Sequence, residues 1–211
     1  MRNYLTEFIG TFFLCLTIGM TALGASPQAP IAIGSALMIM VYMGGHISGG
    51  HYNPAVSLAV MLRGKLPTSQ FLPYVVSQLL GAMTAALITR LILGDMASPD
   101  IGATASVGGA LVNEVLFSFA LCLVVLNVAT SKKTEGNSYY GLAIGFTVVV
   151  GAFAGGGVSG GAYNPAVGVG LGLVRGLLTS TPMNHLWLYI VGPFVGGALA
   201  ALVFKVQEAE A

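Results

Sequence analysis

The sequence carries the same nine-residue segment twice, as SGGHYNPAV at residues 48–56 and as SGGAYNPAV at residues 159–167. The two copies differ only at His51 and Ala162. Asn is preferred just before a helix because its side-chain oxygen accepts a hydrogen bond from an unpaired amide of the first turn. Pro fits the first helical position, where no amide donor is needed. Each copy therefore predicts a short helix that begins directly after its Asn.

The chain around these two segments is too apolar for a soluble protein. Hydrophobic residues make up 55% of it and charged residues 7%, whereas a soluble domain carries about 25% charged residues. The net charge of +1 gives no indication of a nucleic-acid partner. The composition predicts an integral membrane protein, and its 30 glycines suit membrane helices that pack closely.

Six segments are long and apolar enough to cross a bilayer, which takes about 20 helical residues. They are residues 4–24, 30–46, 69–93, 107–130, 138–155 and 184–206. The helices predicted after the two asparagines, 54–62 and 165–178, are shorter and reach only part of the way across. The sequence thus predicts an all-α membrane protein with six transmembrane helices and two re-entrant half-helices, in one domain over residues 1–211.

The two halves of the chain, about residues 1–95 and about residues 107–211, repeat each other beyond the opening segments. For example, Glu7 in the first half recurs as Glu114 in the second. Each half holds three spans, an odd number, so the halves enter the membrane in opposite orientations. This inverted 3+3 repeat brings the N-terminal ends of the two half-helices together near the middle of the membrane.

The meeting point of the half-helices has a clear chemistry. Two positive helix ends at one place oppose cations, including hydronium, and the carboxamides of Asn53 and Asn164 can donate to a passing oxygen. The sequence contains no recognisable nucleophile–base set, metal-ligand cluster or phosphate loop, so we expect neither an enzyme nor a metal or other cofactor. It predicts a pore for neutral, hydrogen-bonding solutes. A secondary transporter built on inverted repeats is a less favoured alternative.

Basic residues are divided unevenly between the two sides of the membrane. Six spans leave both termini on one side, with six Lys and Arg residues there and two on the other side. The six are Arg2, Arg63, Lys65, Lys132, Lys133 and Lys205, and the two are Arg90 and Arg175. The positive-inside rule then places both termini in the cytoplasm, and we expect a multi-pass protein of the cell (inner) membrane.

The paired Asn-Pro-Ala segments and the repeat around them resemble the aquaporin, or major intrinsic protein, family over nearly the whole chain, with a likeness to its prokaryotic-type members. The resemblance implies a passive channel for water and small uncharged solutes, assembled as a homotetramer in the lipid bilayer. The pore motifs that it implies are Asn53, Pro54, Ala55, Asn164, Pro165 and Ala166.

The family's selectivity filter lies on the extracellular side of the two asparagines. Counting without gaps, its four positions fall on Ile33, Ala152, Gly161 and Val167. The family usually has Arg where this chain has Val167, and Val supplies neither its charge nor its donors. The filter is therefore predicted to be wide and apolar, passing ammonia, urea, hydrogen peroxide or glycerol as well as water. A glycerol-facilitator-type channel is the nearest alternative, although the aromatic–Arg filter of that subclass is also missing.

Three ionisable residues near the motifs receive roles from the same resemblance. Glu7 and Glu114 lie inside predicted spans, where a proton relay is the functional alternative. The family favours a scaffold in which each carboxylate accepts hydrogen bonds from loop amides. The resemblance also places His46 along the cytoplasmic half of the pore, whereas His51 is assigned no role.

Overall fold

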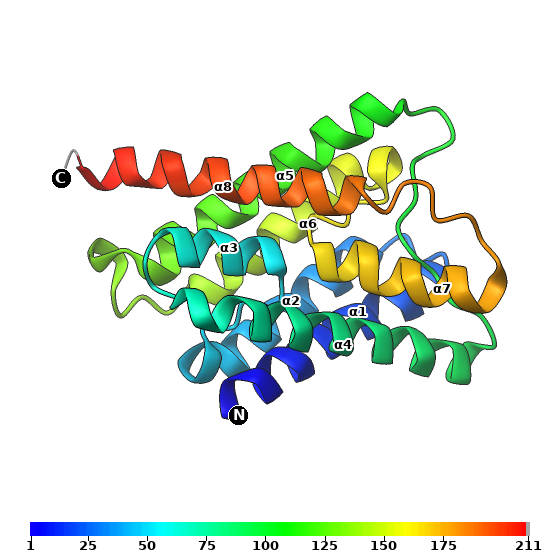
Figure 1. The fold of residues 1–211 in the computed structure, drawn as a ribbon, viewed down its shortest axis with the longest axis horizontal. Coiled ribbons are helices and arrows are strands. Elements are labelled where there is room, and N and C mark those ends of the chain that lie inside the picture. The colour runs from blue at the N-terminus through cyan, green and yellow to red at the C-terminus, as the bar shows by residue number, and fades with distance from the viewer. Residues whose placement is uncertain (210–211) are drawn as a thin grey trace.

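Six long helices, seen in a computed structural model that describes residues 1–209, form the body of the protein (Figure 1). They are α1 (Arg2–Leu23), α2 (Ala29–Ser48), α4 (Thr68–Leu93), α5 (Val107–Thr130), α6 (Tyr140–Ser159) and α8 (Leu188–Ala209). All six are long and apolar enough to cross a membrane. The six predicted spans are thereby confirmed, the last two ending a few residues further along the chain than expected.

Two short helices lie among the long ones, and both follow an Asn-Pro pair. The first is α3 (Pro54–Leu62), as predicted. The second begins as a π-helix, η2 (Ala166–Leu171), and continues as the α-helix α7 (Gly172–Thr179). Figure 1 shows α3 and α7 roughly in line and extending toward opposite ends of the molecule. A short 3₁₀ turn, η1 (Lys132–Thr134), lies in the connection between α5 and α6.

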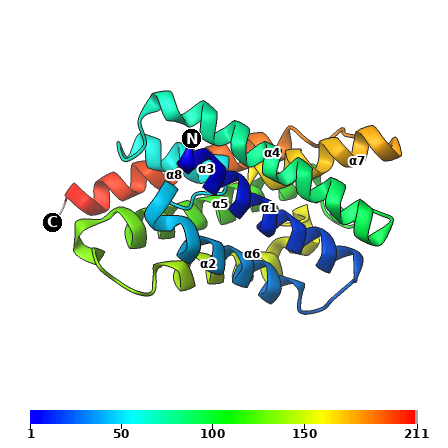
Figure 2. The same ribbon diagram turned by 90° about the horizontal axis from the view of Figure 1, so that it is seen from below.

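The helices pack in a pattern that repeats between the halves. In each half the first long helix packs against the second and the last, as α1 does with α2 and α4 and α5 does with α6 and α8. The half-helices cross over, because α3 lies against α8 while η2 lies against α4. The second long helices of the two halves, α2 and α6, face each other (Figure 2). This is the packing expected of an inverted repeat, and it interleaves the two halves.

Glycines allow the closest of these approaches, and they do so in matching pairs. A Cβ atom on Gly34 of α2 would lie 2.5 Å from the carbonyl oxygen of Gly145 in α6, and a Cβ on Gly145 would in turn collide with the carbonyl oxygen of Gly34. A Cβ on Gly81 or Gly196 would lie 2.5 Å from a backbone oxygen of α1 or α5, respectively. The α2–α6 contact therefore runs through a seam of two glycines at which the halves touch backbone to backbone.

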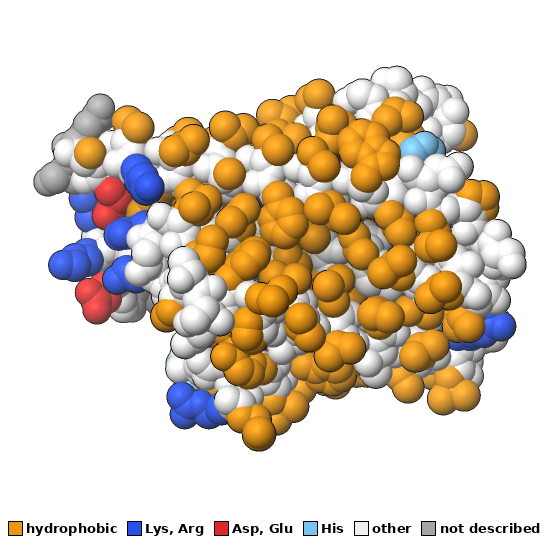
Figure 3. All heavy atoms as spheres, viewed as in Figure 1, with side chains coloured by type: hydrophobic (Ala, Val, Ile, Leu, Met, Phe, Trp, Pro, Cys, Tyr) orange, Lys and Arg blue, Asp and Glu red, His pale blue; other side chains and the backbone are white. Residues whose placement is uncertain are grey.

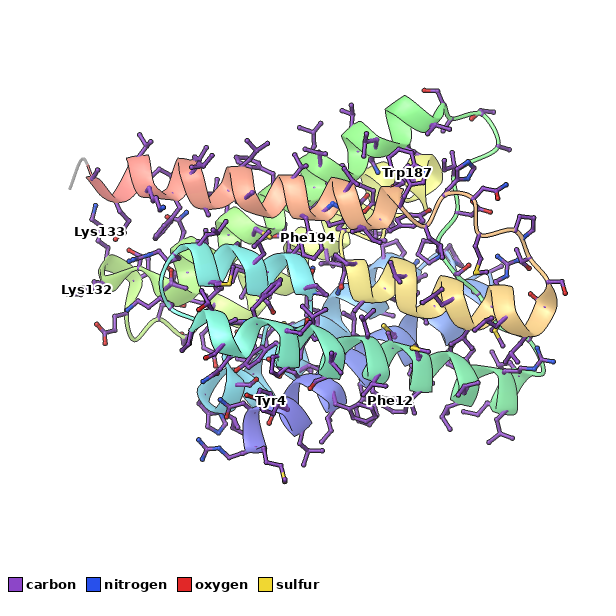
Figure 4. The ribbon with its side chains drawn as sticks, viewed as in Figure 1. Tyr4, Phe12, Lys132, Lys133, Trp187 and Phe194 are labelled. Atoms are coloured by element: carbon purple, nitrogen blue, oxygen red, sulfur yellow. The ribbon has the colours of Figure 1, made fainter. Side chains whose placement is uncertain are left out.

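The outer surface of the bundle is apolar along most of its length (Figure 3). Large hydrophobic side chains such as Leu72, Leu91 and Leu116 are more than half exposed. Charged side chains gather at one end, where Lys132 and Lys133 lie beside the C-terminal part of α8, while Trp187 lies toward the other end (Figure 4). An apolar belt between polar ends is the surface of a protein that spans a bilayer.

Candidate functional site

The two asparagines link the halves of the molecule at its centre. Asn53 caps α3 by accepting from the amide of Ala55 at 2.8 Å, and its Nδ2 donates to the carbonyl oxygen of Tyr163 at 2.9 Å. Asn164 accepts from the amide of Ala166 at 2.9 Å, and its Nδ2 donates to the carbonyl oxygen of Tyr52 at 2.9 Å. Each carboxamide thus caps its own half-helix and holds the opposite loop, and one N–H of each Nδ2 is left for another acceptor.

The loops that lead to the asparagines have the same unusual backbone in both halves. Gly50 and Gly161 both have φ near 63°, and Tyr52 and Tyr163 both have φ of 49°. A positive φ is uncommon for a residue with a bulky side chain, so each loop must be held in place. The tyrosine rings anchor it from behind, since the Tyr52 hydroxyl donates to the Met40 carbonyl and the Tyr163 hydroxyl to that of Gly151.

Two fully buried glutamates hold these strained loops. Glu7 accepts from the Ser48 hydroxyl at 2.7 Å and from the amides of His51 and Tyr52 at 3.0 and 2.7 Å. It also accepts from Gln78 Nε2 at 2.8 Å. All four donors belong to the protein, and two of them are backbone amides of the loop. This arrangement favours the scaffold interpretation of Glu7.

Glu114 makes the corresponding contacts in the second half. It accepts from the Ser159 hydroxyl at 2.6 Å and from the amides of Ala162 and Tyr163 at 3.0 and 2.6 Å. No fourth donor contacts it within residues 1–209, because Pro193 occupies the position that corresponds to Gln78. The same scaffold interpretation follows for Glu114.

A narrow cavity of about 30 Å³ lies beside the two asparagines, which is about the space that one water occupies in the liquid. Its sixteen lining residues form eight pairs, one member from each half, at offsets of 107 or 111 residues. The pairs are Leu14 and Leu121, Ile18 and Val125, Ile33 and Ile144, Leu37 and Val148, Gly50 and Gly161, His51 and Ala162, Asn53 and Asn164, and Val56 and Val167. Only His51 and Ala162 differ in polarity, so the lumen is symmetric and apolar apart from the two asparagines, and His51 is its one unmatched polar side chain.

The four predicted filter residues come together around a second cavity of about 160 Å³, on the side of the asparagines away from the termini. Ile33, Ala152, Gly161 and Val167 all line it. Three of them, Ile33, Gly161 and Val167, also line the narrow central cavity, so the two spaces adjoin. Neither cavity is lined by a charged side chain of the described chain, apart from His51 when it is protonated.

A vestibule of about 600 Å³ lies at the end where the termini are, and the two histidines near it are placed differently. His51 is buried and lines both the vestibule and the central cavity. His46 is exposed at the end of α2 and is not among the residues that line the three cavities. It follows the lumen-facing Ile33 by thirteen residues, which is about 220° around a helix. Of the two histidines, His51 is thus the one that lines these cavities, and the one difference between the repeated segments was the signal for it.

Sequence reasoning also missed the two polar residues that link His51 to Glu7. Ser57 lies one turn inside α3, and its hydroxyl is 3.0 Å from His51 Nδ1. Gln78 comes from α4 and contacts both Ser57 and Glu7. Within residues 1–209, no group of three or more His, Cys, Asp or Glu side chains is arranged to hold a metal ion.

Comparisons with known proteins agree with this geometry. The family model for the major intrinsic protein family matches residues 1–204. The chain is 38% identical to Aquaporin NIP1-1 of Zea mays over 215 residues, covering 97% of this chain and 74% of that protein. It is 33% identical to Glycerol uptake facilitator protein-like 6 of Lactiplantibacillus plantarum over 223 residues, covering the full length of both.

The fold has a close counterpart among solved structures. The X-ray structure of the aquaglyceroporin from Plasmodium falciparum superposes with a TM-score of 0.84 over 96% of this chain and 94% of that chain, at 22% sequence identity. The predicted fold class is confirmed by this match. The chain therefore belongs to the major intrinsic protein family, whose aquaporins and aquaglyceroporins are passive membrane channels and not enzymes.

Proposed function

We propose that the chain is a passive channel for water and small uncharged solutes such as ammonia, urea, hydrogen peroxide and glycerol. Solutes pass from the vestibule through the central cavity to the outer cavity, in single file beside Asn53 and Asn164. The observation that carries the proposal is the continuity of the three spaces, since His51 is shared by the first two and Val167 by the last two.

The proposed filter is the ring of Ile33, Ala152, Gly161 and Val167, and its breadth sets the range of solutes. Two of the four residues have no side chain beyond Cβ, and the other two are aliphatic. A constriction of this kind offers no donor that would hold one solute in a fixed orientation. It therefore selects by size and neutrality, and the positive ends of α3 and η2 disfavour cations at the centre.

The remaining assignments belong to the same proposal. The channel is one domain whose halves are about residues 1–95 and about residues 107–211, and four copies form a homotetramer. Both termini lie in the cytoplasm of a cell whose inner membrane holds the protein, in line with six basic residues at their end of the bundle against two at the other.

The decisive experiment replaces Val167 with Arg in purified protein in lipid vesicles. Val167 is buried against both the central and the outer cavity, so an Arg side chain there fills the filter and adds fixed donors. Stopped-flow measurements should show urea and glycerol flux falling by about tenfold, a change of about 1.4 kcal/mol in barrier, with a smaller loss for water. Val167→Met is the matched control, because it adds length without charge.

Equal urea and glycerol flux in the natural chain and in Val167→Arg would contradict the position of Val167 at the constriction. A glycerol-facilitator-type channel is favoured by the full-length likeness to a glycerol uptake facilitator-like protein. It predicts glycerol flux well above urea flux in the natural chain, whereas a broad apolar filter predicts that the smaller urea passes faster. Counterflow and saturation would indicate a secondary transporter instead.

A further inference from the structure

His51 is the only ionisable side chain among the residues that line the central cavity in the described chain. It lies at the inner end of that cavity, where the vestibule begins. A neutral imidazole has one N–H donor and one lone-pair acceptor, and which nitrogen carries the proton depends on its partners. The partners of His51 therefore decide whether a donor or an acceptor faces the pathway.

A chain of buried hydrogen bonds connects His51 to Glu7. Gln78 Nε2 lies 2.8 Å from Glu7 Oε2 and 3.0 Å from the Ser57 hydroxyl oxygen. The Ser57 hydroxyl oxygen lies 3.0 Å from His51 Nδ1. Glu7, Ser57 and Gln78 have no exposed surface, and His51 is 6% exposed. The whole chain is thus shielded from water, except at the ring.

The direction of these hydrogen bonds follows from the carboxylate at their far end. Glu7 accepts from four donors, so the side of the Gln78 amide that faces it is the NH₂ group. The same NH₂ group donates its second hydrogen to Ser57. The amide keeps this orientation although its carbonyl oxygen has no hydrogen-bond partner within residues 1–209. His51 Nδ1 is the only acceptor within residues 1–209 that lies in hydrogen-bond reach of the Ser57 hydroxyl proton, since the other contact of this hydroxyl is with the Gln78 NH₂ donor. The Ser57 proton therefore goes to His51 Nδ1, and the ring proton is on Nε2.

Gly49 keeps space open in front of that N–H. A Cβ atom on Gly49 would lie 2.9 Å from His51 Nε2. Gly49 has φ of 95°, which favours glycine, and it lines the vestibule together with His51. The Nε2–H group therefore faces the vestibule, while the lone pair on Nδ1 faces into the protein.

We propose that Ser57 and Gln78 are positioning residues that hold His51 as a neutral ring with its Nε2–H directed at the permeating solute. That a solute passes this N–H rests on the proposed channel function. The assignment of the ring proton rests on the hydrogen bonds alone. A solute oxygen accepts from this N–H as it enters the narrow cavity. A proton that arrives from the vestibule meets the Nε2–H and not the lone pair on Nδ1, which accepts from Ser57, so His51 stays neutral and flux stays independent of pH.

Other charged and titratable groups surround His51 from each neighbouring element. Glu7 of α1 reaches it through Gln78 and Ser57, and the Tyr74 ring of α4 has its centroid 5.2 Å from that of His51. The groups that share the vestibule with it are Lys65, Lys132 and Glu135. None of these is hydrogen-bonded to the His51 ring in the part of the chain that is described. Loss of Ser57 or Gln78 thus leaves Nδ1 free to take a proton, with the Glu7 carboxylate nearby to favour it.

The first test is ¹⁵N NMR of histidine-labelled protein in lipid bilayers. The chain has three histidines, and the signal that His51→Asn removes identifies the ring. The natural chain should show the Nε2–H tautomer alone from about pH 8 to about pH 5. Ser57→Ala and Gln78→Leu should show mixed tautomers and a ring that takes up a proton as the pH falls across this range. Ser57→Thr, which keeps the hydroxyl, should restore the natural spectrum.

Flux measurements give the second readout. Urea flux in the natural chain should not change with pH, whereas flux through Ser57→Ala should fall at least about twofold between about pH 8 and about pH 5 as the ring becomes charged. Ser118→Ala is the matched control, because Ser118 is equally buried and its hydroxyl has no partner within residues 1–209. It should leave both the spectrum and the pH profile unchanged.

Two results would overturn the proposal: an Nδ1–H tautomer in the natural chain, or the same titration of His51 with and without the Ser57 hydroxyl. The spectra report the tautomer whether or not a solute passes. A natural chain that conducts nothing would therefore count against the channel, and not against the assignment of the proton.

Discussion

The two halves of the molecule share one scaffold and differ in the polar network behind it. In the first half Glu7, Gln78, Ser57 and His51 form a continuous hydrogen-bonded chain. The corresponding residues of the second half are Glu114, Pro193, Gly168 and Ala162, so only the glutamate is kept. The loops nonetheless have matching backbone angles. The glutamate and the asparagine occur in both halves and are thus what the fold requires. Gln78, Ser57 and His51 occur in one half only and add a hydrogen-bonded chain to one side of the pore.

The largest expected effect comes from removing the shared part of the scaffold. Glu7→Leu leaves four buried donors without an acceptor and Glu114→Leu leaves three. Each unsatisfied donor costs about 1–3 kcal/mol, so Glu7→Leu should lose at least about 4 kcal/mol of unfolding free energy and Glu114→Leu at least about 3 kcal/mol. Equilibrium unfolding in detergent measures this, with the exposed Glu135→Leu as control. Equal losses would show that the Gln78 contact adds nothing.

A smaller effect is expected at the asparagines, where the halves are alike. Asn53→Ala and Asn164→Ala each remove one helix cap and one hydrogen bond to the opposite loop. A cap is worth about 0.5–2 kcal/mol and a hydrogen bond about 1 kcal/mol. The two variants should therefore lower the unfolding free energy by similar amounts, and the partly exposed Asn127→Ala by much less. A clearly larger loss for one of them would show that the two halves are not equally held.

The smallest expected effect on stability, and the sharpest on function, comes from exchanging the one unlike pair in the lumen. Ala162→His places a ring where Gly168 and Pro193 offer no hydroxyl or amide partner, so we expect urea flux that falls about twofold on acidification as the ring takes up a proton. His51→Ala gives both halves the same apolar side chain at this position and should give higher flux that does not vary with pH. Vesicle flux series at several pH values test both. A flat profile for Ala162→His would mean that its ring lies outside the pathway.

Most of the architecture was open to prediction because it depends on patterns that are local in the sequence. Asn53 and Asn164 stand before Pro and cap helices for a local reason, and the six apolar stretches need only length and composition. Counting from the asparagines was also enough to select Ile33, Ala152, Gly161 and Val167, which line one cavity together. Glu7 and Glu114 stood out because a charge inside an apolar span needs a partner.

The unpredicted features depend on how helices turn and pack against one another. His46 and His51 are five residues apart, and only the end of α2 at Ser48 decides that the second of them enters the lumen. Gln78 reaches Glu7 across 71 residues of sequence because Gly81 brings α4 close to α1. The π-helical segment Ala166–Leu171 contains Gly168, which lies against Tyr189, and Gly170, which lies against Ala82. No local sequence pattern reveals these contacts.

The exchange of hydrogen bonds between the asparagines has a consequence for synthesis. Asn53 Nδ2 can donate to the carbonyl oxygen of Tyr163 only after that residue, 110 positions further along the chain, has been synthesised. During translation the loop of the first half therefore lacks this hydrogen bond until the second half has entered the bilayer. The complete pore forms in a single late step. For the same reason, two separately expressed halves should be inactive alone and should recover conduction when they are produced in one cell.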